Sequence, residues 1–231
     1  LPDPAPMSER ERRLLRMLVV SIADQALGKS IDEAMDLAEA VRIVWSHPQV
    51  RAEVTELFAL LDGQLDHLHP VVGLPEDVPL SVHARYTRLE IQSALGDAKG
   101  AAVRPPTWRE GVRWLPDAAT DVFVFTLDKT DSGFSPTTRY RDYAISRELI
   151  HWESQSMTRA DSPTGRRYRQ HVERGSSVML FARLNKSERA FWFLGPAQYV
   201  SHRSEQPMQV TWRLEAPLPG DLYAQFAAAV A

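Results

Sequence analysis

The chain has 231 residues, 44% of them apolar and 25% charged, which is typical of one or two globular domains and too long for a disulfide-stapled miniprotein. The absence of cysteine excludes disulfide bonds, thiolate zinc sites and cysteine nucleophiles. No apolar run approaches the roughly 18 residues of a membrane-spanning helix, and residues 1–6 lack the features of a signal peptide. We therefore expect a soluble, cytoplasmic protein without a membrane partner.

The formal net charge of -3 hides an uneven distribution of charge along the chain. Residues 1–100 hold 10 basic and 16 acidic residues, whereas residues 139–189 hold 11 basic and 6 acidic ones. Most basic residues are arginine, whose planar guanidinium suits phosphates and base edges. The basic segment predicts contact with nucleic acid, and an ordinary solvated surface rich in arginine is the alternative.

Helical periodicity dominates the first hundred residues. Ser-x-x-Glu sequences at residues 8–11 and 30–33 have the spacing of a capping box and precede apolar residues at helical intervals. Pro48 is expected to end the second helix and to begin the third. Ser81 is expected to cap a fourth helix, with a glycine as its stop. We predict four helices that form a packing platform over residues 1–100.

In residues 101–231 the sequence pattern changes to short runs of β-branched and aromatic residues, which are typical of strands. The predicted strands are 111–115, 121–127, 140–145, 149–153, 177–184, 190–200 and 208–214. Ser162 and Pro163 interrupt them as the cap and first residue of a predicted helix over residues 164–173. The expected fold class is α+β, with the helical platform followed by a mostly antiparallel, β-barrel-like domain that has one inserted helix.

The densest polar segment reads His-Trp-Glu-Ser-Gln-Ser at residues 151–156. Alternation along a strand divides it between two faces, with His151, Glu153 and Gln155 on one and Trp152, Ser154 and Ser156 on the other. One row of hydrogen-bonding groups is thereby displayed together, as needed to read a base edge or a polar ligand. The alternative is a buried polar strand with Trp152 in the core.

Basic and aromatic residues around this segment are candidate phosphate and stacking contacts. Tyr140 and Tyr143 alternate with arginines, as a nucleic-acid surface requires, although half-buried tyrosines of a scaffold show the same pattern. Thr164 and Gly165 stand at the start of the predicted helix, where backbone amides favour an anion. The arginines expected to neutralise phosphates are Arg139, Arg141, Arg159, Arg166, Arg167 and Arg169.

Enzymatic chemistry finds weaker support in the sequence. Asp121, Asp128 and Glu153 are the carboxylates that a metal-dependent nuclease would use, but Gln155 stands where a restriction-type nuclease usually has lysine. The histidines do not cluster as metal ligands, and nucleophile elbows, phosphate loops and dinucleotide-binding glycine motifs are absent. We expect no enzymatic activity, no metal and no cofactor, with a nuclease as the alternative.

Several sequence segments resemble an uncharacterised bacterial domain that usually forms the C-terminal part of DEAD/DEAH-type superfamily-2 helicases, often behind a phospholipase-D-type nuclease domain. These segments lie at residues 79–88, 126–129, 143–146, 151–156, 162–165, 193–196, 199–202 and 210–214. The resemblance implies a domain of unknown function, helicase and nuclease domains of the same polypeptide as partners, and a role in DNA processing, restriction or phage defence. No helicase motif is present in this chain.

The pattern of residues 175–181, 191–196 and 208–214 also resembles small β-barrels that read modified bases, which implies a pocket for a flipped base. We therefore predict a non-enzymatic DNA-binding module, with a modified or flipped base as candidate ligand. The alternatives are a metal-dependent nuclease and a structural docking or dimerisation domain. The expected DNA-binding residues are Tyr140, Tyr143, His151, Trp152, Glu153, Gln155, Ser156, Arg159, Thr164, Arg166 and Arg167.

Overall fold

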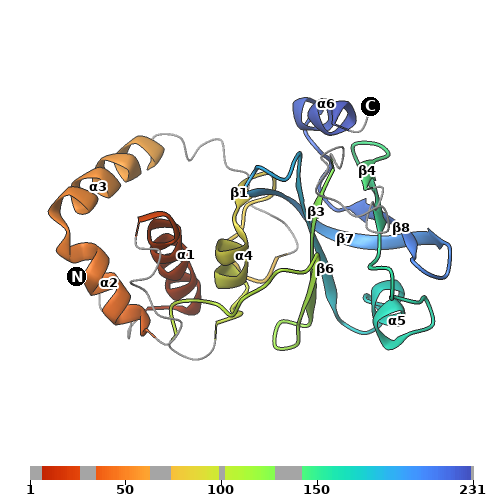
Figure 1. Cartoon of the computed structure of the whole chain (residues 1–231), viewed down its shortest axis with the longest axis horizontal. Coiled ribbons are helices and arrows are strands. Elements are labelled where there is room, and N and C mark those ends of the chain that lie inside the picture. The colour runs from red at the N-terminus through yellow and green to blue at the C-terminus, as the bar shows by residue number, and fades with distance from the viewer. Residues whose placement is uncertain (1–6, 27–34, 63–73, 99–101, 128–141, 230–231) are drawn as a thin grey trace. The chain divides into compact units, whose positions relative to one another are not determined.

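The computed structural model describes residues 7–26, 35–62, 74–98, 102–127 and 142–229 (Figure 1). The chain divides into two compact units. Unit 1 comprises Leu1–Ser81 and Tyr86–Trp108, and unit 2 comprises Val82–Arg85 and Arg109–Ala231. Within the described ranges, no helix is long and apolar enough to cross a membrane.

The described part of unit 1 is helical. Its helices are α1 (Glu9–Ala26), α2 (Leu37–Ser46), α3 (Pro48–Asp62) and α4 (Arg88–Ala94). The capping box predicted at the start of α1 is confirmed, because the Ser8 amide donates to Glu11 Oε2 at 2.8 Å and the Glu11 amide donates to Ser8 Oγ at 3.3 Å. Pro48 begins α3, as predicted.

Two helix starts differ from those predicted. The box at residues 30–33 lies outside the described residues, and α2 is capped by Asp36, whose side chain accepts from the Ala38 amide at 2.8 Å. Ser81 does not cap the fourth helix. That helix begins after Thr87, which forms a capping box with Glu90, whereas Ser81 has no glutamate three residues later.

Unit 2 is built on the sheet, which has eight strands among the described residues. The strands are β1 (Arg85–Tyr86), β2 (Val112–Leu115), β3 (Thr120–Thr126), β4 (Tyr143–Ala144), β5 (Leu149–Glu153), β6 (Ser177–Arg183), β7 (Phe191–Arg203) and β8 (Gln209–Leu214). Their order is β2-β3-β6-β7-β8-β5-β4, with β1 beside β7. Along this order the neighbouring strands are antiparallel except β3 and β6, which are parallel, so the predicted α+β class with a mostly antiparallel sheet is confirmed.

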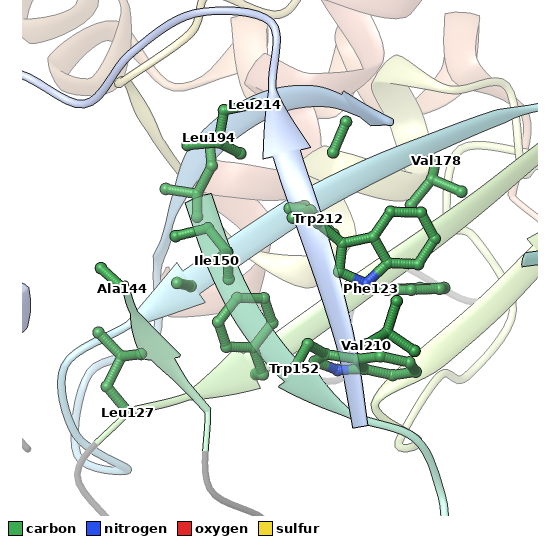
Figure 2. Close-up of a cluster of buried hydrophobic side chains, with 14 of the residues drawn as sticks. Phe123, Leu127, Ala144, Ile150, Trp152, Val178, Leu194, Val210, Trp212 and Leu214 are labelled. Atoms are coloured by element: carbon green, nitrogen blue, oxygen red, sulfur yellow. The ribbon is translucent and has the colours of Figure 1, made fainter. Parts of the chain in front are cut away.

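The sheet curls around one hydrophobic core. Phe123 of β3 and Trp152 of β5 are separated by three intervening strands, which would place them about 19 Å apart in a flat sheet. Their rings instead stack with centroids 4.3 Å apart, and Figure 2 shows Phe123 between Trp152 and Trp212. Strands so distant in the sheet order can touch only if the sheet curves strongly, which agrees with the barrel-like domain predicted from the pattern of strands.

Two helices accompany the sheet. The predicted cap of α5 (Pro163–Arg169) is confirmed, because Ser162 Oγ accepts from the Gly165 amide at 3.1 Å. Helix α6 (Gly220–Ala228) was not predicted, and its Leu222 and Phe226 join the core of the sheet. Their spacing of four residues places both side chains on one helix face.

Candidate nucleic-acid interface

Four adjacent strands, β4, β5, β8 and β7, present one continuous polar surface on the side of the sheet away from the core. We call it the polar face. It consists of Tyr143, Leu149, His151, Glu153, Gln198, Ser201, Arg203, Gln209, Thr211 and Arg213. The strand register arranges these residues in three rows across the strands, about 7 Å apart because residues on one face recur every second position.

The central row places two rings in contact. It runs from Tyr143 through His151 and Thr211 to Ser201. The rings of Tyr143 and His151 stack with centroids 4.6 Å apart and planes inclined by 12°. Tyr143 is 36% exposed on β4, at the end of the strand order. The row therefore combines an accessible aromatic stack with two hydroxyl side chains that donate and accept hydrogen bonds.

The flanking rows add amide, carboxylate and guanidinium groups. One row joins Glu153, Gln209 and Arg203, and Gln209 Nε2 donates to Glu153 Oε1 at 3.1 Å. The other row contains Arg213 on β8. Arg203 and Arg213 are exposed, and neither forms an ion pair with another residue in the described part of the chain. Two uncompensated positive charges thus bracket the aromatic row.

A bulge in β7 brings the last residues of that strand onto the polar face. Tyr199 pairs with Trp212 and Ser201 with Thr211, so Val200 is an extra residue. In a regular strand that kept Val200 in the ladder, strict alternation would turn Ser201 toward the core. The Tyr199 amide donates to His171 Nε2 at 3.1 Å, which fixes the backbone at this position.

His171 is neutral where it supports the bulge. Its Nε2 accepts from the Tyr199 amide, so Nδ1 carries the proton and donates to the Ser176 carbonyl at 3.3 Å. Burial lowers the pKa of His171, and the bond to Ser176 opposes that effect. Protonation would remove the acceptor that the Tyr199 amide uses.

Trp152 does not belong to the polar face. It is 3% exposed and stacks on Phe123 in the core (Figure 2). His151 and Glu153, its neighbours in β5, point to the opposite side because side chains alternate along a strand. The structure therefore contradicts a pocket in which Trp152 stacks on a base held by Glu153.

The alternation predicted for residues 151–156 holds only as far as the strand continues. Ser154 is buried on the Trp152 side, where its Oγ accepts from the Met208 amide at 2.9 Å. Gln155 and Ser156 follow the end of β5 at Glu153 and are exposed in the next turn. The row of hydrogen-bonding groups along β5 is thus shorter than predicted.

Arg167 does not offer its charge to a phosphate. Its Nε and Nη2 donate to the two carboxylate oxygens of Asp121 at 2.6 and 2.8 Å, and Asp121 is fully buried. The guanidinium also lies 4.3 Å from the centre of the Trp114 ring. Burial raises the pKa of Asp121, while the hydrogen bonds from Arg167 oppose this rise. This geometry joins α5 to β3 and engages a carboxylate that the nuclease alternative needs.

At the start of α5, the Gly165 amide of the predicted anion site is already engaged within the helix cap. The Gly165 amide donates to Ser162 Oγ, and the Arg166 amide donates to the Ser162 carbonyl at 2.9 Å. Arg166 itself is exposed on α5. Arg159, in the preceding loop, is exposed and pairs with Asp161 at 3.1 Å.

Arg169, predicted to neutralise a phosphate, is the last residue of α5 and is partly buried. The other predicted residues, Asp128, Arg139, Tyr140 and Arg141, lie outside the described ranges. Of the nuclease carboxylates, Asp121 is bound by Arg167 and Glu153 by Gln209. Among the residues with described structure, no group of three histidine, aspartate or glutamate side chains lies close enough to hold a metal ion.

The structure thus unites Tyr143, His151 and Glu153 on one surface with residues that sequence reasoning missed. The missed residues are Gln198, Ser201, Arg203, Gln209, Thr211 and Arg213. The strand Gln-Val-Thr-Trp-Arg-Leu at 209–214 carries a signal for three of them, since polar residues alternate with buried Val210, Trp212 and Leu214. The bulge in β7 hid the same signal there.

None of the curated proteins compared with the chain matches it. One solved structure with a similar arrangement is SUVH6 of Arabidopsis thaliana in complex with SAM, at 13% sequence identity and a TM-score of 0.41. The alignment covers 92% of this chain and 41% of SUVH6, so the chain spans less than half of that structure. The family model described as "Domain of unknown function (DUF3427)" matches residues 80–226, and the chain therefore belongs to the DUF3427 family.

Proposed function

We propose that this chain is a non-enzymatic DNA-binding module and that DNA lies across the polar face. The observation that carries the proposal is the stacked pair of Tyr143 and His151 in a row flanked by Arg213 and Arg203. Aromatic rings that stack on bases, beside cations that contact phosphates, are the two elements of a nucleic-acid surface.

Each part of the polar face has a chemical role in this proposal. Arg203 and Arg213 contact phosphates, because neither charge is compensated within the described residues. Thr211 and the Glu153–Gln209 pair offer donors and acceptors to base edges. Gln155 and Ser156, exposed beyond the end of β5, extend this polar surface.

The experiment is fluorescence anisotropy of a labelled DNA with the purified chain, over a salt series from about 50 to 200 mM, where phosphate contacts dominate the change in affinity. In the double variant Arg203→Ala/Arg213→Ala, the slope of log affinity against log salt should fall by about 1.4 to 1.8, from about 0.7 to 0.9 per lost contact. Arg174→Ala is the matched control, because Arg174 is exposed outside the polar face and bonds Gln170. No binding at 50 mM salt would refute the proposal.

Selectivity for a modified base is the finer part of the proposal. It is tested with matched duplexes that are unmodified, methylated or hydroxymethylated, without Mg²⁺. Preference for one duplex that is lost in Gln155→Ala supports a modification reader, whereas equal binding leaves a general DNA-binding surface. Cleavage that requires Mg²⁺ and disappears in Glu153→Ala would instead support the nuclease alternative.

The wider context that we propose is DNA processing or defence against foreign DNA, with helicase and nuclease domains of a larger polypeptide as partners. The support is the sequence resemblance described above. Purified DEAD/DEAH-type helicase and nuclease domains mixed with this chain provide the test. Co-elution in size-exclusion chromatography is expected, and separate elution would contradict the partnership.

A second candidate function is protein docking through α3. Leu57, Phe58, Leu60 and Leu61 of this helix are between 44% and 64% exposed. Contiguous exposed apolar side chains often mark protein interfaces. If α3 docks a protein, light scattering should show that the chain associates with itself or with the helicase domain. Leu60→Glu should remove this association without changing DNA affinity. A chain that stays monomeric at all concentrations and in the presence of the helicase domain would argue against docking.

A further inference from the structure

We infer that the polar face takes single-stranded rather than double-stranded DNA. The inference rests on the proposed DNA-binding function and names its substrate class. It follows from the width of the face, the position of the aromatic pair within it, and the separation of Arg203 and Arg213.

The polar face is too wide for a groove of duplex DNA. Its four hydrogen-bonded strands span about 14 Å between the outermost backbones, at about 4.8 Å per spacing. The major groove is about 12 Å wide and admits a helix or a two-stranded ribbon, and the minor groove is narrower. A duplex therefore cannot bring its base edges to Tyr143 on β4 and to Ser201 on β7, at the two ends of the central row, at the same time.

The chemistry of the central row also favours unpaired bases. The ring of Tyr143 is partly exposed and is backed by His151 at 4.6 Å. A stacking surface needs a base whose flat face is free, and bases inside a duplex have both faces covered by their neighbours. Unpaired bases of a single strand offer that face without the cost of unstacking a helix.

Arg203 and Arg213 lie where a single DNA strand that crosses the sheet would place its phosphates. Arg213 precedes the central row by one row and Arg203 follows it by one row, so bases over Tyr143 and His151 have a cation on either side. The rows are about 7 Å apart, which separates the two charged rows by about 14 Å. A flexible single strand can span both rows while its bases stack between them.

The test compares a 20-nucleotide oligo(dT) with a 20-base-pair duplex at about 50 mM salt, where phosphate contacts are strongest. Oligo(dT) is expected to bind at least tenfold more tightly. Tyr143→Leu should weaken oligo(dT) binding by about 5- to 150-fold, the range of one lost base–aromatic stack, and should change duplex binding by less than twofold. Tyr143→Phe keeps the ring and should bind oligo(dT) within twofold of the unmodified chain.

Each outcome is informative. Tighter oligo(dT) binding that depends on the ring at Tyr143 supports the inference, and an unchanged melting temperature shows that the leucine variant folds. Equal or tighter duplex binding overturns the inference while leaving the proposed DNA-binding function standing. Oligo(dT) binding that is unaffected by Tyr143→Leu also overturns it. Failure of both DNAs to bind overturns the proposed function itself.

Discussion

Replacement of Trp152 by alanine tests whether this side chain belongs to the core or to a binding surface. Trp152 is 3% exposed. Its ring stacks on that of Phe123 with centroids 4.3 Å apart and lies edge-to-face with that of Tyr168 with centroids 5.8 Å apart. Loss of a buried tryptophan of this kind costs about 3–5 kcal/mol in the free energy of unfolding. At about 3 °C per kcal/mol, the melting temperature should fall by about 9–15 °C.

Thermal unfolding followed by tryptophan fluorescence or circular dichroism provides the measurement. Trp152→Phe retains a ring against Phe123 and should lose less stability than Trp152→Ala. Tyr143→Leu is the control on the polar face and should change the free energy of unfolding by about 0.5 kcal/mol or less. A Trp152→Ala variant that melts within about 2 °C of the unmodified chain but no longer binds DNA would refute the core assignment.

Three further predictions concern unit 2. Asp121→Asn should reduce the free energy of unfolding in urea by about 2–4 kcal/mol, since it leaves a partly buried guanidinium without its charged partner, and a loss below about 0.5 would contradict this. Gly165→Ala should cost about 2–3 kcal/mol, because its Cβ would overlap the Arg159 carbonyl oxygen, whereas Gly220→Ala, with open space, should be nearly neutral. Burial lowers the pKa of His171, so the unfolded chain binds more protons than the folded chain. The urea midpoint of unfolding should therefore fall as the pH drops below about 6.5, and it should fall less in His171→Gln. Equal pH dependence of the two proteins would contradict a stabilising role of neutral His171.

Much of the fold could be predicted because its signals are local. The strand at 149–153 was predicted with its observed bounds, and β6 differs only at its end, because alternation and β-branched residues act within each segment. The parallel pairing of β3 with β6 has no such local signal. The start of α4 was predicted at the wrong residue although Thr87 and Glu90 carry the stronger box.

The candidate site was predictable only in part, since it is assembled across strands. Tyr143, His151 and Glu153 were identified from polar alternation and aromatic composition, and they do share one surface. The partners from β8 and β7 depend on register and on the bulge after Tyr199, which no single segment encodes. The ion pair that engages Arg167 likewise could not be predicted, because its partner, the buried Asp121, is 46 residues away in the chain.

Photo-crosslinking shows directly whether DNA lies on the polar face. A 20-nucleotide oligo(dT) with bromodeoxyuridine at single positions is irradiated with the purified chain, and crosslinked peptides are identified by mass spectrometry. If DNA lies there, crosslinks should form in the peptides that carry Tyr143, His151 and Thr211, and unlabelled oligo(dT) should remove them by competition. Crosslinks confined to the helices of unit 1, or spread without preference over the chain, would contradict it.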